Sequence, residues 1–275
     1  MFSPEERARL RSELLEFAAS DKRVSGAAVT GSAAGEGEDR WSDIDLAFGV
    51  ADGAGIHDVL SDWTNRMYAD HRALHHLDVR RGSWIYRVFL LSNTLQVDLA
   101  FVPASEFRAL APSFRLVHGK ANEPQHSPPP LAVDLIGWAW LYALHARSAI
   151  ERGNAWQAEY MISGVRDHAL ALACVRYGVP AIQARGIHRL PKEVTAPFEA
   201  GLVRQLEPAE LRRAFRAVLR ALLAEIRKID EELAGRLEQP LLSLGDDATI
   251  ALESSIMADH PPASDTSEGT DLGIN

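Results

Sequence analysis

Apolar positions in the first fifty residues follow two different periods. Between residues 10 and 17 they recur at helical spacing, behind the start signal Ser3-Pro4-Glu5-Glu6, in which a candidate cap precedes a proline and two acids. This pattern predicts a helix that ends near Asp21. Short apolar runs at 24–31 and 43–50 predict two buried strands instead, separated by a loop rich in Gly, Ser and charged residues.

The pattern continues with one more helix and three more strands. Residues 56–69 have helical periodicity, and 74–81 alternate as a strand does. Residues 83–103 predict two strands joined at Ser92-Asn93-Thr94, which is a hairpin. The order helix, strand, strand, helix, strand, hairpin predicts an α/β (α+β) domain with a small mixed sheet over residues 1–118.

The second half of the chain has a different pattern. Prolines and polar residues at 119–130 indicate a linker. Helical periodicity then covers 131–152, 155–177, a shorter element near 192–204, and one long helix from 208 to about 237. No strand signal recurs, so residues 131–244 are predicted to form an all-α helical bundle domain. Residues 245–275 have the composition of a disordered acidic tail.

Charge changes this picture little. The formal net charge is −9, but residues 245–275 carry seven acids and no Lys or Arg, which leaves 31 acids and 29 bases elsewhere. The body of the chain is therefore close to neutral. Without a basic run, a nucleic-acid partner is disfavoured, although a nucleotide-sized anion remains compatible with the composition.

Cysteine content and hydropathy indicate the cellular compartment of the protein and the kinds of site that it can contain. Cys174 is the only cysteine and falls in an apolar helical pattern, so we expect a buried thiol and neither disulfides nor a cysteine-based metal site. No apolar run is long enough for a membrane span, and the N-terminal residues lack a signal peptide's apolar core. These features predict a cytoplasmic protein without a membrane partner, and they leave the oligomeric state open.

Two aspartates at the start of the second strand are the first candidates for chemistry. Because alternate side chains of a strand share a face, Asp43 and Asp45 project together with Ala47. On the last strand of the hairpin, Asp98 and Ala100 share a face in the same way. If these two strands are neighbours, three carboxylates converge.

Three carboxylates in one place repel one another unless a cation compensates them. Oxygen ligands of this kind suit Mg²⁺, and two such ions can activate an attacking oxygen and stabilise a departing one in phosphoryl chemistry. Gly31 and Ser32 add a second element, because glycine allows close backbone approach to a phosphate and the hydroxyl can donate to it. The alternative is that an Asp-x-Asp pair at a strand start only caps a turn.

These motifs resemble a known family. The stretch "GSAAGEGEDRWSDIDLAF", followed by "LQVDLAF", is similar to the signature of the polymerase-beta-like nucleotidyltransferase superfamily. The order of a small α/β unit and a helical bundle is similar to that of the antibiotic nucleotidyltransferases that modify aminoglycosides such as kanamycin. The motif resemblance covers about residues 24–103, and the helical half matches in layout only.

The resemblance implies a role for each motif residue. Gly31 and Ser32 would cradle the triphosphate, with Arg40 and Ser42 of the same stretch as further nucleotide-binding candidates. The resemblance also implies that Asp43 and Asp45 bind Mg²⁺, and that Asp98 is the third acid, either as a metal ligand or as a catalytic base. One departure is that the loop after Gly-Ser is acidic, with Glu36, Glu38 and Asp39, where many members of the family have basic residues.

One polar constellation stands out in the helical half. At spacings of three, four and three, Trp156, Glu159, Ser163 and Arg166 lie close to one face of the helix predicted at 155–177. Glu159 could accept the proton of an acceptor hydroxyl as a general base, and Arg166 is a candidate for phosphate contact. The alternative is an interhelical salt bridge with Trp156 in the core.

The sequence therefore predicts a Mg²⁺-dependent nucleotidyltransferase. It would use ATP or another NTP, transfer the nucleoside monophosphate to a hydroxyl of a small molecule such as an aminoglycoside, and release pyrophosphate, with antibiotic resistance as the corresponding role. Two alternatives stay open: a toxin-like enzyme that acts on tRNA or protein, and a non-catalytic nucleotide-binding regulatory module.

Overall fold

The computed structural model describes residues 1–35 and 37–246, which form two compact units divided between Pro128 and Pro129. The acidic tail predicted at 245–275 lies outside the described residues from position 247 onward. Each unit has its own hydrophobic core. Within the described part of the chain, no helix is long and apolar enough to cross a membrane.

The first unit is built on a six-stranded mixed sheet with the strand order β3-β4-β5-β2-β1-β6. Its elements in chain order are α1 (Pro4–Ser20), β1 (Val24–Thr30), the 3-10 turn η1 (Gly31–Ala34), β2 (Ile44–Val50), α2 (Ile56–Asp70), β3 (Ala73–Arg81), β4 (Trp84–Leu91), β5 (Gln96–Pro103), the 3-10 turn η2 (Ala104–Glu106) and β6 (Phe114–Gly119). Neighbouring strands are antiparallel except β2 and β5, which run parallel.

The start of α1 shows how local sequence sets an element. Ser3 caps the helix by accepting a hydrogen bond from the backbone N–H of Glu6, whose side chain accepts one from the backbone N–H of Ser3. This reciprocal arrangement satisfies two backbone donors that the first turn would otherwise leave unpaired. Pro4 at the first helical position adds to the start signal.

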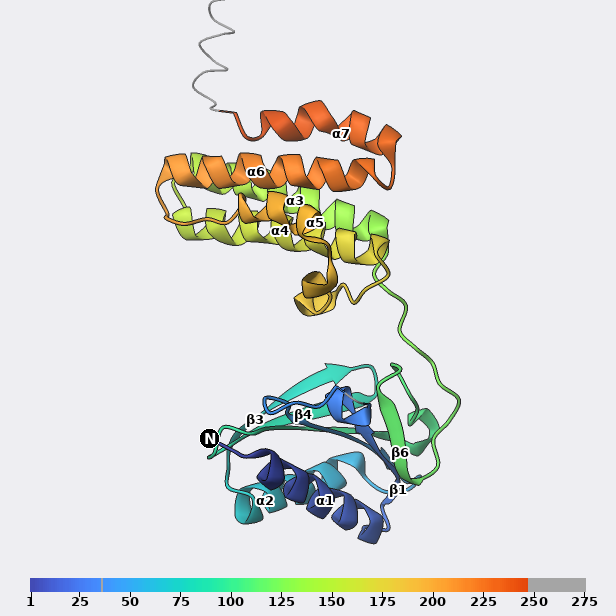
Figure 1. Ribbon diagram of the computed structural model, residues 1–275. Helices are drawn as coiled ribbons and strands as arrows, with labels where there is room; N and C mark the ends of the chain where they lie inside the picture. The colour runs from blue at the N-terminus through green and yellow to red at the C-terminus, as the bar shows by residue number, and fades with distance from the viewer. Residues whose placement is uncertain (36, 247–275) are drawn as a thin grey trace, which may run out of the picture. The chain divides into compact units, whose positions relative to one another are not determined.

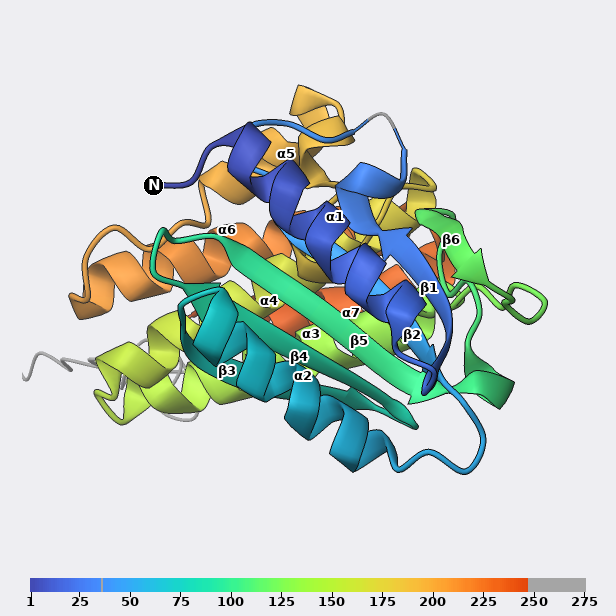
Figure 2. The same ribbon diagram turned by 90° about the horizontal axis from the view of Figure 1, so that it is seen from below.

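Helices α1 and α2 cover one face of the sheet, as Figures 1 and 2 show. The core between them takes alternate residues of the central strands, among them Leu46 and Phe48 of β2 and Leu99 and Phe101 of β5. The residues between these face the other way, where Ala47 and Ala100 belong to a smaller cluster around Phe107. The alternation predicted from the sequence is therefore confirmed for both strands, and the aspartates lie on the face that the two helices leave uncovered.

The second unit is helical throughout its described residues. Its elements are α3 (Ala132–Glu151), α4 (Ala155–Arg176), the 3-10 turns η3 (Ile182–Ala184) and η4 (Ile187–Arg189), α5 (Lys192–Glu199), α6 (Pro208–Arg227) and α7 (Glu231–Ser243). Helix α4 packs on α3 and α6, and α7 packs on α6 (Figure 1). Cys174 of α4 is buried as a free thiol, as predicted.

The predicted fold class, a small mixed sheet followed by an all-α bundle, is confirmed, with two differences in the elements. The single long helix predicted from 208 to about 237 is wrong: it ends at Arg227, and Asp230 caps α7 by accepting a hydrogen bond from the backbone N–H of Leu233. The prediction also missed β6, a largely exposed strand that pairs with β1 at the edge of the sheet.

Candidate functional site

The parallel pairing of β2 with β5 puts two of the predicted acids side by side. Asp45 and Asp98 are directly opposite each other in the register, on the face that carries Ala47 and Ala100. Neighbouring strands lie about 4.8 Å apart, so the backbones of Asp45 and Asp98 are close neighbours, and the carboxylate of Asp45 reaches Gly31 at the end of β1. The sheet therefore holds this pair through its backbone, independently of any loop.

Asp98 is a strongly perturbed acid. It is half-buried, and its Oδ1 is fully buried without a hydrogen-bond partner. Burial, with a smaller contribution from the negative charge of Asp43, raises the pKa of Asp98 to about 6. A carboxylate in this state has an unmet demand for a positive charge or a proton.

Asp43 is the third predicted acid, and its negative charge acts on Asp98. It lies one residue before β2, and its Oδ2 accepts a hydrogen bond of 2.9 Å from Nε2 of Gln96. Among residues 1–35 and 37–246, no group of three or more His, Cys, Asp or Glu side chains is gathered closely enough to hold a metal ion. The three predicted carboxylates therefore do not form a ready-made metal cluster in the described residues: Asp45 and Asp98 are register partners, and Asp43 is the acid whose charge acts on Asp98.

Gly31 lies against the carboxylate of Asp45. It follows β1 directly and has φ +62°, a left-handed conformation that favours glycine. A Cβ atom at this position would overlap with Oδ2 of Asp45, so no other residue fits without moving that carboxylate. Ser32 is the next residue of the η1 turn. The predicted Gly-Ser element therefore adjoins Asp45, one of the predicted acids.

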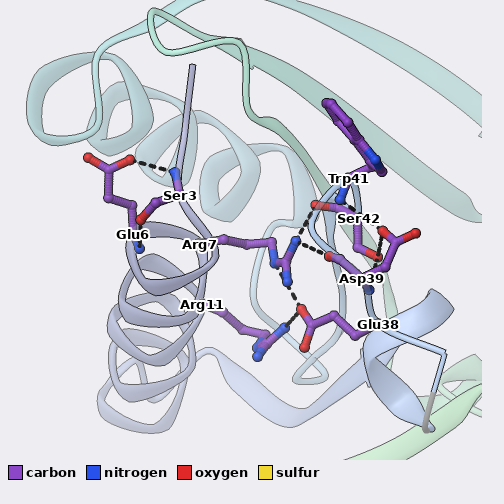
Figure 3. A network of polar contacts seen from close by, with 8 residues as sticks. All are labelled: Ser3, Glu6, Arg7, Arg11, Glu38, Asp39, Trp41 and Ser42. Atoms are coloured by element: carbon purple, nitrogen blue, oxygen red, sulfur yellow. Dashed lines mark hydrogen bonds and ion pairs between the residues drawn. The ribbon is translucent and has the colours of Figure 1, made fainter.

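The acidic loop after η1 is held by two arginines of α1, as Figure 3 shows. Both Arg7 and Arg11 form ion pairs with Glu38. The Arg11 hydrogen bond, with smaller contributions from the positive charges of both arginines, lowers the pKa of Glu38. Of the loop acids that the sequence pointed to, Glu38 is therefore compensated within this unit.

Two other candidates of this loop have contacts of their own. The guanidinium of Arg40 lies 4.4 Å from the ring centroid of the exposed Trp41. The hydroxyl of Ser42 accepts a hydrogen bond from the backbone N–H of Asp39 and donates one to its Oδ1, at 2.9 and 3.1 Å. Ser42 is thus part of the loop's internal turn, and Arg40 stands at its exposed surface.

Sequence reasoning missed three residues next to this site. Arg7 and Arg11 come from a distant helix, although Arg7 falls on the same stripe as Leu10 and could have been noticed there. Tyr86 of β4 pairs with Ala100, two register positions from Val88, the partner of Asp98. Burial raises the pKa of Tyr86, and the negative charge of Asp98 contributes in the same direction. The alternation of side chains along β4 was the signal that could have revealed Tyr86.

The helical unit carries the remaining candidates. The hydroxyl of Ser163 donates to Oε1 of Glu159 at 2.8 Å, and Trp156 is 78% exposed. The alternative with Trp156 in the core is therefore wrong. Arg166 forms an ion pair with Asp167 at 2.8 Å and lines a pocket of about 420 Å³. The other lining residues are Leu170, Ile187, His188, Leu190, Lys192, Thr195, Phe198, Glu199 and Leu202.

Comparisons with known proteins give little further information. No protein-family model matches the chain, and no curated protein matches it. Among solved structures, an aminoglycoside 6-adenyltransferase from Bacillus subtilis is similar over 90% of this chain and 100% of its own, with 12% sequence identity and a TM-score of 0.40. At this TM-score the likeness says nothing about individual residues, so the site has to be judged by its own geometry.

Proposed function

We propose that this protein is a Mg²⁺-dependent nucleotidyltransferase that transfers a nucleoside monophosphate from ATP or another NTP to a hydroxyl of a small molecule and releases pyrophosphate. The observation that carries the proposal is the carboxylate pair on the open face of the sheet. Asp45 and Asp98 are neighbours in the register, and the buried Oδ1 of Asp98 has no hydrogen-bond partner. A divalent cation would give the buried oxygen of Asp98 the partner that it lacks, with Asp45 as a second ligand.

The residues present fit a magnesium ion. Hard oxygen ligands are what Mg²⁺ prefers, and it usually takes one or two carboxylates while substrate phosphates and water complete its octahedron. Asp45 and Asp98 would supply these carboxylates, and Asp43 would be a further ligand from the flank. Bound there, the metal would neutralise charge on the phosphates during transfer.

Other groups of the sheet unit would act on the substrates directly. Gly31 would offer its backbone N–H to a phosphate while leaving room for the carboxylate of Asp45, and Ser32 would offer a hydroxyl donor beside it. Arg40 is an exposed cation near the loop's tip for the triphosphate. Above a pH of about 6, Asp98 is ionised and able either to bind metal or to accept the proton of the acceptor hydroxyl.

The helical unit would provide the acceptor site. The carboxylate of Glu159 and the exposed ring of Trp156 suit a polar, positively charged molecule of the aminoglycoside type. Trp156 would bind it through a cation–π contact and Glu159 through an ion pair. Arg166 would contact a phosphate. The near-neutral body of the chain favours such a small acceptor over tRNA.

Pyrophosphate release is the direct test of this function. The protein is incubated with each NTP and Mg²⁺ against a panel of aminoglycosides, other hydroxylated antibiotics and bulk RNA. Asp45→Asn is expected to lower the rate by roughly 100-fold or more, because removing one charged group from a reaction centre commonly has that effect. Asp52→Asn is the matched control, since Asp52 is an exposed acid beyond the opposite end of β2; it should leave the rate unchanged.

Three other results would contradict the proposed site or favour one of the alternative functions. A rate that survives in Asp45→Asn contradicts the proposed site. Transfer to RNA but to no small molecule would favour the toxin-like enzyme. Mg²⁺-assisted NTP binding without release of pyrophosphate for any acceptor would favour the regulatory module.

A further inference from the structure

Arg7 is a buried arginine that the reaction outlined above does not use. It belongs to the buried stripe of α1 together with Leu10, Leu14 and Ala18, yet its charged group is at the loop and not in the apolar core. Only 4% of its surface is exposed. A buried charge is costly unless it is paired and hydrogen-bonded, so its partners indicate what the burial achieves.

The partners of Arg7 all lie in the loop that leads to Asp43 (Figure 3). Its Nη1 donates to the backbone oxygens of Asp39 at 2.7 Å and Ser42 at 2.9 Å, and its Nε lies 2.9 Å from Oε1 of Glu38. One guanidinium thus contacts both ends of the segment from residue 38 to 42. Since Ser42 directly precedes Asp43, the contact of Arg7 with the backbone oxygen of Ser42 is one residue away from a proposed metal ligand.

The segment held by Arg7 is itself preorganised. Oδ1 of Asp39 accepts hydrogen bonds from the backbone N–H of Trp41 and the hydroxyl of Ser42, and that hydroxyl accepts one from the backbone N–H of Asp39. These local bonds make a compact turn, which Arg7 then fixes to α1. Arg11 adds a second cation on Glu38 without touching the backbone of the turn.

We propose that Arg7 is a positioning residue that fixes the loop from residue 38 to 42 on α1 and thereby sets the place of Asp43 beside Asp45 and Asp98. The inference rests on the proposed function, because it assigns Asp43 to the metal and triphosphate step. It also gives the acidic loop a role: Glu38 is an anchor for the two arginines of α1.

A lysine cannot replace Arg7 in this role. The guanidinium presents several N–H groups in a rigid fork, whereas the lysine ammonium is a point charge at the end of a flexible chain. Arg7→Lys keeps the charge that compensates Glu38 but cannot reach the carboxylate and two separate backbone oxygens in the same geometry. The Lys variant therefore separates positioning from charge compensation.

The test compares Arg7→Lys and Arg7→Met with Arg9→Met, a matched control on the exposed side of the same helix, where Arg9 has only a 4.0 Å contact with Glu13. We expect both Arg7 variants to lower kcat/KM for the NTP by about 10- to 100-fold and to require more Mg²⁺ for half-maximal rate, because small misplacements of reacting groups have effects of this size. KM for the acceptor should stay within twofold, and Arg9→Met should match the wild type.

A second measurement keeps the inference independent of turnover. Amide hydrogen exchange of residues 37–43 and calorimetric titration with Mn²⁺ plus NTP are recorded on the full chain, with thermal unfolding as the check on folding. Arg7→Lys is expected to exchange faster in this segment and to bind Mn²⁺–NTP more weakly while the chain remains folded at the assay temperature, with a Tm lowered only by the lost hydrogen bonds. If exchange and binding are both unchanged, Arg7 has no positioning role, whether or not an acceptor has been found. If they change while no acceptor is turned over, the catalytic assignment fails and the positioning role stands.

Discussion

Two carboxylates with little exposure to solvent, Asp98 in the sheet unit and Glu225 in the helical unit, are treated in opposite ways. Glu225 is 2% exposed and fully paired: Nη2 of Arg176 donates to its Oε2 at 2.8 Å, and Nζ of Lys228 to its Oε1 at 2.6 Å. Asp98 has a buried oxygen without a partner, and its charged neighbour Asp43 is of the same sign.

The difference separates a structural carboxylate from one that is available for chemistry. Glu225 joins α6 to α4 through Arg176, so its negative charge is compensated within the fold. At Asp98 the fold leaves a charge uncompensated, which costs stability and is tolerated where a ligand supplies the missing partner. This contrast supports the placement of the reaction on the sheet without any reference to motif.

The first and largest prediction is that neutralising these two carboxylates has opposite consequences. Asp98→Asn should lower turnover by roughly 100-fold or more and stabilise the free protein by about 2 kcal/mol at pH 7.5, after allowance for partial solvent screening. Glu225→Gln should leave turnover within twofold and destabilise by about 1–3 kcal/mol, because two cations lose their charged partner. Urea unfolding and the pyrophosphate assay measure both effects.

The pH dependence gives this prediction a sharper form. Because the pKa of Asp98 is raised from 3.8 to about 6 in the fold, its contribution to stability is fully present below pH 3.8 and is lost as the pH rises through 6. Asp98→Asn should lack this decline, and Mg²⁺ with NTP should reduce it in the wild type. The exposed Glu232→Gln serves as a control with no change beyond about 0.5 kcal/mol. A parallel decline in wild type and Asp98→Asn would contradict the contrast between the two carboxylates.

The second prediction concerns the space beside the carboxylate pair. Gly31→Ala should lower turnover by about 100-fold, because the new Cβ overlaps with Oδ2 of Asp45 and displaces it. Gly82→Ala is a close control: its φ of +58° is similar to the +62° of Gly31, but a Cβ there meets no atom within 4 Å. Both variants carry a backbone cost of about 1 kcal/mol, visible in thermal unfolding. Equal turnover in the two variants would show that the contact with Asp45 is irrelevant to the reaction.

Much of the sheet unit could be predicted because strand alternation is a local property. The period of two along β2 and β5 was enough to put Asp45 and Asp98 on the uncovered face. Their opposition in the register depends on the pairing of distant strands, which the sequence raised only as a condition. The buried atom of Asp98 depends on packing by several strands and could not be predicted from spacing.

The features that the sequence did not reveal depend on long-range packing or on weak local signals. β6 has exposed residues and lacks a clear apolar run, so only its pairing with β1 defines it. The end of α6 at Arg227 has no Gly or Pro to mark it, although Asp230 followed by two acids is a helix-start pattern. Arg7 contacts the loop across more than thirty residues of sequence, a distance over which no periodicity operates.

The third and smallest prediction concerns whether the helical unit binds the acceptor. Trp156 and Glu159 lie on one face of α4, exposed and half-buried respectively, so Trp156→Ala and Glu159→Gln should each change the free energy of unfolding by no more than about 0.5 kcal/mol. If this face holds the acceptor, KM for the acceptor should rise by about tenfold while KM for the NTP stays constant, because only acceptor binding loses a contact. Gln157→Ala, one residue along the same helix and exposed, is the matched control. An unchanged acceptor KM in both variants would remove these residues from the acceptor site and leave the chemistry of the sheet unit unaffected.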